Sequence, residues 1–497
     1  MPRISSLLTL TALLALSACG PGGSGGTFTS LVGPAELALP VFDDGTNKTL
    51  ALRDLSGSGA PMTVAVTAVP GGPLLGSPFS VPARGELRLP VLLVEGWLLI
   101  ETTGASTGLV EPYLLTERSG PDEEATQGAV FATTQSAIPI HRLADKVLFL
   151  NHSEMAGVPT AAAFTFTFHD TAGVPTVLFG GVPLAVGADS SLTLPTLPAA
   201  VGHLSVVPVP AAGVAFAFTL ATHDDNDIVL DVDDQRRLLD AGAFSTADLI
   251  LDFGKDADGN YHDFDILASN VSDAPASFTI QSIRDSAGNA ILLMPRTVNL
   301  LTRQARLYAS NLSDSVGLVN PEVHPFADLF GDVFAAGGLT RFRMALSISG
   351  DMFLTARQFD PLALDFAMRV RPIARRHTTS VLVSEAQTTT AGGILNIIQV
   401  SNPTGGSMTV NLRAFTQTLG TEYVLPSVIV PPFGMLEWSA DALGLREVVG
   451  DLASPEVRNL RIVLLSNIAF VSRPYQKTRN GAELIVMLRP HVIRHDD

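Results

Sequence analysis

The chain has 497 residues, of which 46% are apolar and only 16% are charged. This composition excludes an intrinsically disordered chain, which would be poor in apolar residues and rich in charge. Acidic residues outnumber basic ones 48 to 31 and the net charge is −17, which argues against a protein that binds nucleic acid by neutralising phosphates. The single cysteine excludes an intramolecular disulfide. The length predicts three or four domains of ordinary size.

The first residues have the pattern of a secretory signal. Residues 7–16 (LLTLTALLAL) are apolar, but the stretch is shorter than the roughly 20 residues that a transmembrane helix needs. Its length is that of the apolar region of a signal peptide. It is followed by the tetrad Leu16-Ser17-Ala18-Cys19.

This tetrad resembles the lipobox of bacterial lipoproteins. The resemblance implies a signal peptide over residues 1–18, cleavage before Cys19 and lipidation of that cysteine, with Gly20 directing export towards an outer membrane. Residues 19–27 then form a Gly/Ser tether. The alternative is an ordinary signal peptide with a cysteine there by chance, but the position of the only cysteine favours the lipoprotein.

The rest of the sequence repeats one pattern of strands and turns four times. The predicted copies cover residues 28–118, 137–230, 245–372 and 378–497. The third and fourth copies both place Ser-Asn between two strands, and the repeated asparagines are Asn151, Asn270 and Asn402, 119 and 132 residues apart. The third and fourth copies also share an R-P-x-x-x-R-H pattern near their ends.

Alternating apolar residues rich in Val, Ile, Phe and Thr predict strands with one buried face. One such face includes Phe278 and Ile280, and another includes Met408, Val410 and Leu412. The predicted fold class is all-β, with four tandem antiparallel β-sandwich modules whose strands resemble immunoglobulin- or fibronectin-type domains in general layout. Short helices are predicted in modules three and four, at residues 326–336 and 440–450.

Connections are predicted where the repeat breaks, at residues 119–136, 231–244 and 373–379. All are short, so we expect a beaded rod with limited bending.

No residue is predicted to be catalytic. Residues 104–108 match G-x-S-x-G, but that motif needs a strand before it and a helix after it. Here it joins two strands, and we interpret it and its counterparts in the other copies as hairpin turns. Trp97 and Trp438 lie in alternating strands, which favours packing in the core over binding of a ligand.

Calcium is the one cofactor that the sequence leaves open, because clustered carboxylates suit this cation. A cluster of six aspartates lies between the second and third copies: Asp224, Asp225, Asp227, Asp231, Asp233 and Asp234. A second group, at residues 256–265, resembles part of a calcium loop and also suits a hairpin turn. We favour a solvated acidic linker at the first and a turn at the second.

We therefore expect a lipid-anchored protein of the cell envelope, at the outer membrane and facing the periplasm or the cell surface. Its role would be structural, adhesive or scaffolding, without enzymatic activity. Its partners would be the membrane, through the Cys19 lipid, and other envelope proteins or a surface polymer. The alternatives are a carbohydrate-binding or carbohydrate-processing lipoprotein and a module of a secreted appendage.

Overall fold

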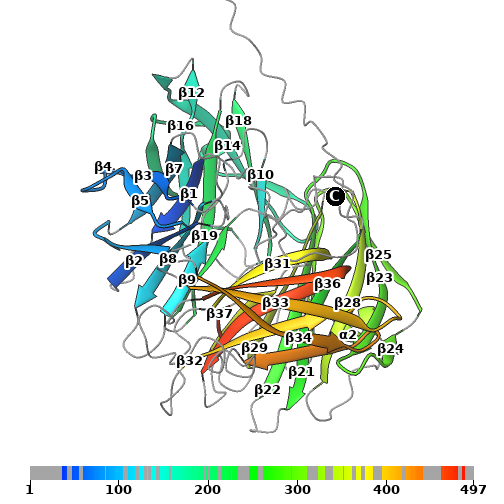
Figure 1. The fold of residues 1–497 in the computed structure, drawn as a ribbon. Helices are drawn as coiled ribbons and strands as arrows, with labels where there is room; N and C mark the ends of the chain where they lie inside the picture. The colour runs from blue at the N-terminus through cyan, green and yellow to red at the C-terminus, as the bar shows by residue number, and fades with distance from the viewer. Residues whose placement is uncertain are drawn as a thin grey trace, which may run out of the picture.

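The structure is a computed structural model, and it is built almost entirely of β-strands (Figure 1). It describes residues 36–41, 47–54, 60–83, 86–93, 95–103, 110–117, 123–127, 131, 136–140, 146–155, 158–194, 197–198, 201–209, 214–224, 227–232, 246–255, 261–292, 294–310, 323–330, 340–350, 352–360, 365–370, 375–383, 394–416, 421–439, 460–478 and 484–486.

The described strands pair within four consecutive sets, which we call strand groups 1 to 4. Group 1 contains β1 (Glu36–Val41), β2 (Asn47–Asp54), β3 (Met62–Val69), β4 (Gly72–Pro73), β5 (Phe79–Val81), β6 (Glu86–Val91), β7 (Gly96–Thr103), β8 (Val110–Glu117) and β9 (Glu123–Gln127). Group 2 contains β10 (Ser136–Ile140), β11 (Lys146–Asn151), β12 (Glu154–Met155), β13 (Val158–Pro159), β14 (Ala162–His169), β15 (Pro175–Val177), the 3₁₀ turn η1 (Phe179–Gly181), β16 (Leu184–Val186), β17 (Ser190–Leu194), β18 (Gly202–Val209), β19 (Phe216–Asp224) and β20 (Asp227–Val232).

Groups 3 and 4 make up the second half of the chain. Group 3 contains β21 (Thr246–Lys255), β22 (Tyr261–Asn270), β23 (Ala276–Asp285), β24 (Ala290–Leu292), β25 (Arg296–Leu300), β26 (Ala305–Ala309), β27 (Val323–Pro325), helix α2 (Phe326–Phe330), β28 (Thr340–Ser349), β29 (Met352–Asp360) and β30 (Asp365–Val370). Group 4 contains β31 (Arg376–Val383), β32 (Ile394–Ser401), β33 (Met408–Thr416), β34 (Glu422–Val430), β35 (Met435–Ser439), β36 (Leu460–Thr478) and β37 (Leu484–Val486).

The same pairing order recurs in every group. One layer has the order β1-β7-β3 in group 1, β10-β18-β14 in group 2, β21-β28-β23 in group 3 and β31-β36-β33 in group 4. The other layer has the order β6-β2-β8-β9 in group 1, β17-β11-β19-β20 in group 2, β26-β22-β29-β30 in group 3 and β35-β32-β36-β37 in group 4. We call these the first and second sheets of a group. All described pairs are antiparallel except β26 with β27.

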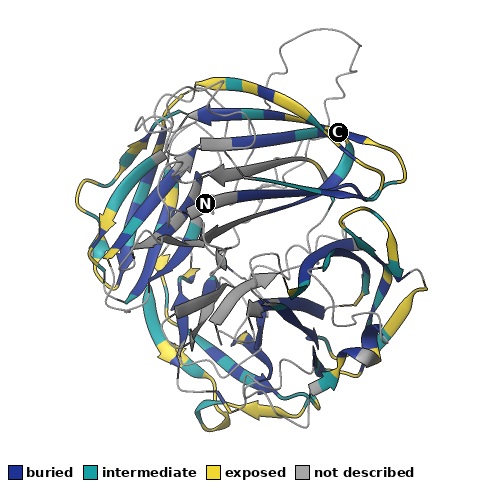
Figure 2. Cartoon of the chain, turned by 90° about the horizontal axis from the view of Figure 1, so that it is seen from below, coloured by how far each residue is buried: buried dark blue, intermediate teal, exposed yellow. Residues whose placement is uncertain are grey.

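A core of apolar side chains lies between the two sheets of each group. In β14 the alternating phenylalanines Phe164, Phe166 and Phe168 point into this core, and the threonines between them are half-buried. Figure 2 shows the buried positions between the layers and the exposed ones at the outer hairpins. The faces predicted from the sequence are confirmed, because Phe278 and Ile280 are buried in group 3 and Met408, Val410 and Leu412 in group 4.

The connection that holds the G-x-S-x-G match is not a hairpin, and this prediction was wrong. β7 belongs to the first sheet of group 1 and β8 to the second, so the chain crosses between sheets there. The same crossing follows β18 and β28, while in group 4 the long strand β36 passes through both sheets without a break. A crossover needs the same Gly- and Pro-rich turns as a hairpin, so the residue pattern did not distinguish the two.

A buried asparagine is the last residue of the second strand in groups 2 and 3 and directly follows it in group 4. The side-chain amide of Asn402 donates to the carbonyls of Gly406 and Pro431 at 2.7 and 3.0 Å, and its oxygen accepts from the amide and hydroxyl of Thr404. Asn151 and Asn270 make the same kind of contacts to their own loops. The repeated Asn-x-Ser/Thr pattern therefore fixes one loop against a neighbouring turn, since a buried amide must satisfy its donors and its acceptor.

Two of the expected connections contain strands. β9 lies within residues 119–136 and pairs with β8, and β20 reaches into residues 231–244 and pairs with β19. β9 also contacts β37, so the first and last groups touch and the expected extended rod is wrong. The helix predicted at residues 440–450 lies outside the described residues, and α2 covers the first five residues of the other predicted helix. No helix in the described ranges is long and apolar enough to cross a membrane.

Candidate functional site: the junctions between strand groups

The predicted lipidation and calcium residues lie largely outside the part of the chain that the structure describes. This is the case for Cys19, Asp225, Asp233 and Asp234, and for the side chains of Asp224, Asp227 and Asp231. The backbone of the acidic segment nevertheless folds back on itself, because Asp224 of β19 lies opposite Asp227 of β20. The first half of the segment is therefore a hairpin and not a linker.

The second predicted calcium segment also falls partly on strands. Residues 256–260 are outside the described ranges, whereas Asp263 and Asp265 are buried in β22. The Asp263 carboxylate accepts from the Phe264 amide at 2.7 Å and from the Ser310 hydroxyl. Within the described ranges, no three His, Cys, Asp or Glu side chains are grouped so that they could hold a metal ion.

The polar side chains that do come together lie where consecutive strand groups meet. At each junction, one end of the first sheet of a group packs on the outer face of the second sheet of the following group. Because that second sheet is covered on both sides, its central strand is buried on both faces. In β11, Val147 and Phe149 point into the core, while Leu148 and Leu150 point into the junction.

Junction 1–2 is apolar. Trp97, at the start of β7, is fully buried against Leu148, Leu150 and Ala217 of group 2. The prediction that Trp97 packs in apolar surroundings is confirmed, although its neighbours belong partly to the next group. Trp438 is half-buried against the core of group 4.

Junction 2–3 contains two stacked histidines. His169 of β14 lies directly opposite His203 of β18, and the ring centroids are 4.6 Å apart with 13° between the planes. His203 is completely buried, and its Nδ1 lies 2.8 Å from the hydroxyl of Ser269 on β22 of group 3. Among the described residues, neither His203 Nε2 nor His169 Nδ1 has a hydrogen-bond partner.

The surroundings of these histidines favour neutral rings. Burial lowers the pKa of His203 well below its ordinary value, and the nearby His169 and Arg303 lower it further. Burial also lowers the pKa of His169, followed by the charge of Arg303, while a backbone hydrogen bond with Gly173 and the charges of Asp273 and Asp170 act in the opposite direction.

The contact between Ser269 and His203 does not make a catalytic pair. A nucleophilic serine needs a neighbouring base and also access to substrate. Both side chains are 0% exposed, and the serine approaches Nδ1 from the following strand group. The contact therefore joins two groups of strands, and the geometry does not support attack on a substrate.

Junction 3–4 contains ion pairs in place of the histidines. Asp252 of β21 accepts from Arg341 Nε at 2.6 Å, from Arg473 Nη2 at 3.2 Å and from Gln358 Nε2 at 3.1 Å. Arg473 belongs to β36 of group 4, is completely buried and also donates to the carbonyl of Ile250. Arg341 extends the network by an ion pair with Glu437 of β35.

The ionisation of Asp252 follows from this arrangement. Burial by itself would raise the pKa of its carboxyl group, but the guanidinium groups of Arg341 and Arg473 outweigh this and hold the pKa well below its ordinary value. Asp252 is therefore charged throughout the neutral and mildly acidic range.

A second buried carboxylate binds two arginines at the same junction. Asp248 accepts from Arg343 at 3.1 Å and from Arg375 at 2.7 and 3.2 Å. Arg375 directly precedes β31, so this pair holds the connection between groups 3 and 4 against β21.

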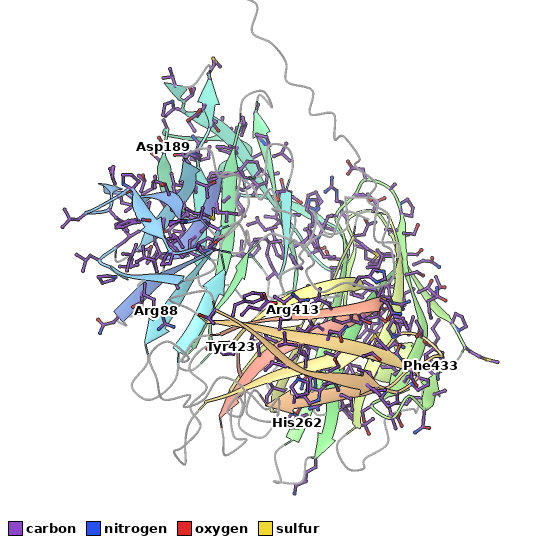
Figure 3. All side chains as sticks on the ribbon, in the orientation of Figure 1. Arg88, Asp189, His262, Arg413, Tyr423 and Phe433 are labelled. Atoms are coloured by element: carbon purple, nitrogen blue, oxygen red, sulfur yellow. The ribbon has the colours of Figure 1, made fainter. Side chains whose placement is uncertain are left out.

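Junctions 2–3 and 3–4 also share a backbone contact. The turn after β14 approaches the turn before β26, where the Ala305 amide donates to the Thr171 carbonyl at 3.2 Å. The turn after β23 approaches the turn before β35, where the Met435 amide donates to the Ser286 carbonyl at 2.8 Å. Next to the second contact, the Arg284 guanidinium lies 3.9 Å from the ring centroid of Phe433, which is labelled in Figure 3.

These polar groups join the sheets of consecutive strand groups. At junction 3–4 the buried carboxylates are bound by guanidinium groups. At junction 2–3 the two histidine rings are stacked on each other. Both sets of side chains lie where sheets of consecutive strand groups meet. Sequence reasoning missed these residues, because partners such as Asp252 and Arg473 are 221 residues apart in the chain. The only signal in the sequence was the run of apolar and polar residues without alternation in strands such as β22, which is typical of a strand buried on both faces.

The chain matches no protein-family model, and no curated protein is similar to it.

Proposed function

We propose that this chain is a lipid-anchored protein of the cell envelope that has a structural, adhesive or scaffolding role and no enzymatic activity. The lipid is attached to Cys19, and the protein faces the periplasm or the cell surface from the outer membrane. Its partners are other envelope proteins or a surface polymer.

One observation carries the non-enzymatic role. The strongest polar clusters in the described residues are used to join strand groups, as Asp252 with Arg341 and Arg473 illustrates. A buried ion pair of this kind fixes a specific arrangement of elements more than it adds to stability. Fixed relative placement of sandwiches is what a scaffold or an adhesion protein needs in order to present its loops.

The recurring strand order supports four tandem β-sandwich modules as the architecture of this scaffold. In the proposal each strand group is one module, and each module uses its second sheet as the platform for the module before it. Repeated units that bury a face against their neighbour form a continuous body.

The anchor is tested with a substitution at Cys19. The wild-type protein should incorporate an alkyne-labelled fatty acid and sediment with membranes, because Cys19 carries the only thiol. Cys19→Ser should abolish labelling, and the protein should remain unprocessed or be released. Ser24→Ala, in the same Gly/Ser stretch, serves as the control and should behave as the wild type.

A Cys19→Ser protein that is cleaved as before and stays with the membrane would contradict the anchor. The role itself is tested by crosslinking on intact cells followed by identification of the crosslinked molecules. Recovery of a defined envelope protein or surface polymer supports a scaffold. Turnover of a saccharide by the purified protein would contradict the non-enzymatic role.

A further inference from the structure

The stacked histidines of junction 2–3 are neutral groups in a place where a charge would be poorly tolerated. His203 is completely buried and His169 is 7% exposed. With the ring centroids 4.6 Å apart, protonation of one ring places a positive charge beside the other ring without water to screen it.

A backbone hydrogen bond with Gly173 favours a charged His169, but the charged groups around the pair give little compensation. Ser269 of β22 and Ser205 of β18 are uncharged, and Arg303 of the turn before β26 is itself positive. The two nearby carboxylates help little. Asp273 is 86% exposed and already binds Arg303 at 2.9 Å, and Asp170 accepts from the amides of its own turn.

The pair lies at the contact between two strand groups, where His203 of group 2 faces Ser269 of group 3. Ser269 and Arg303 belong to group 3 and the histidines to group 2, so separation of the groups would expose the completely buried ring of His203 to water. Among the described residues, one backbone hydrogen bond joins the groups nearby, from the Ala305 amide to the Thr171 carbonyl. Two small apolar clusters also join these groups: Val201 packs against Leu267, Ala305 and Leu307, and Ala137 packs against Val271 and Phe353.

We propose that the His169–His203 pair makes junction 2–3 acid-sensitive, so that protonation of the pair releases strand group 3 from strand group 2 while both groups stay folded. The inference does not depend on the lipid anchor or on the scaffolding role. It gives the chain a joint whose stiffness follows the pH of its surroundings.

The direction follows from proton linkage. The closed junction lowers the pKa of both rings, so the open junction binds more protons at mildly acidic pH. The closed form is therefore fully stable above the ordinary histidine pKa of 6.5, and it loses stability as the pH falls below that value. Each proton bound only in the open form shifts the equilibrium by up to about tenfold per pH unit.

The experiment measures hydrogen exchange of the full chain between about pH 7.5 and 5.0, on either side of the ordinary histidine pKa, corrected for the intrinsic effect of pH. The Ala305 amide reports on the junction, and the amides of β23 report on the interior of group 3. We expect loss of protection at Ala305 by about tenfold or more below pH 6, with little change in β23. Unchanged protection at Ala305, or equal loss in β23, would overturn the proposal.

The matched variant is His169→Gln combined with His203→Gln, which removes titration and keeps polar side chains. It should make Ala305 protection independent of pH. His152→Gln, a half-buried histidine of group 2 that binds Asp189 at 2.7 Å, should leave the pH dependence as in the wild type. A pH dependence that persists in the double variant would contradict the role of the pair.

A second measurement uses the unmodified protein, in case the double variant does not fold. NMR titration of the histidine rings should show both rings protonating below the ordinary pKa of 6.5, His203 well below it, together with the loss of Ala305 protection. Protonation of both rings while Ala305 stays protected would reject the proposal.

Discussion

Junctions 2–3 and 3–4 are built on the same backbone contact and respond differently to acid. In both, the turn after the third strand of the first sheet contacts the turn before the first strand of the next group's second sheet. Around this contact, junction 2–3 holds neutral His169 and His203, whereas junction 3–4 holds Asp252 with Arg341 and Arg473. The repeated fold therefore sets where the groups touch, and the side chains set the conditions under which they stay together.

The signs of the two pKa shifts separate the junctions on the pH scale. The histidines have a lowered pKa, so junction 2–3 is weakened as the pH falls below 6.5. Asp252 also has a lowered pKa, but as an acid it stabilises the folded form above its ordinary pKa of 3.8 and loses this effect only as the pH falls through the lowered value. At about pH 5 junction 3–4 should therefore be intact while junction 2–3 is weakened.

Of the substitutions considered, Arg473→Met is expected to cause the largest loss of stability at a junction. The substitution removes one buried partner of Asp252 and the donor to the Ile250 carbonyl. Loss of one partner of a buried ion pair costs about 3–5 kcal/mol. The loss can be measured by hydrogen exchange of the Asp252 amide, which donates to Gln358 Oε1 at 3.2 Å.

The control for this substitution is Arg413→Met, on the half-exposed pair with Glu422 at 2.7 Å; Arg413 is labelled in Figure 3. An ion pair of this type contributes about 0.2–1 kcal/mol. If both substitutions cost the same, Arg473 does not hold junction 3–4 and the two junctions are not chemically different in the way we argue.

The sequence was informative where a property is local. Strands, their buried faces and the repeated asparagines follow from neighbouring residues, so Phe278 and Met408 could be assigned to cores directly. The junctions could not be predicted in this way, because their chemistry depends on which surface faces which. Ser269 was visible as part of a repeated Ser-Asn pair, yet nothing in the sequence placed it beside His203.

The histidine pair shows the same limit of prediction from the sequence. Successive side chains of a strand point to opposite faces, so the sequence predicts which residues of β14 share a face with His169. The same rule does not show that His169 lies opposite His203, because cross-strand register depends on the whole sheet. Only the structure brings the two rings together.

The second prediction concerns the glycines at the shared backbone contact. Gly288 has φ +89°, and a Cβ there would lie 2.5 Å from the Pro432 carbonyl oxygen; Gly173 has φ +84° and the corresponding distance to the Thr302 oxygen is 2.7 Å. Alanine at either position is expected to cost about 1 kcal/mol for the positive φ and about 1–3 kcal/mol more because the facing turn must move.

Gly180→Ala separates the two causes, because Gly180 has φ +71° and no atom lies within 4 Å of the position that an alanine Cβ would take there. Gly180→Ala should therefore show only the free-energy cost of placing alanine at a positive φ. Hydrogen exchange of Met435 and Ala305 reports the effect at each junction. If Gly173→Ala costs no more than Gly180→Ala, the turn contact does not hold junction 2–3 closed.

The smallest expected effect concerns Arg303, which lies beside the histidines and is 13% exposed at its side chain. Burial is the main cause of the lowered pKa of both rings, and Arg303 adds to it. Arg303→Gln should therefore raise the pKa of His169 and His203 by less than about one unit, since one unit corresponds to about 1.4 kcal/mol. Arg296→Gln, an exposed arginine of the same group, should leave both values unchanged.

The consequence for junction 2–3 has two parts that the measurement distinguishes. Arg303 also binds Asp273 and the Val271 carbonyl, both within group 3, so its loss loosens the turn of group 3 that faces the histidines at neutral pH. When the pKa of the rings in the closed form is raised, the closed and open forms differ less in the number of protons they bind. Ala305 protection therefore depends less on pH than in the wild type. An NMR titration in which neither ring moves would show that burial alone keeps the pair neutral, and the acid sensitivity would then depend only on how tightly the two strand groups exclude water.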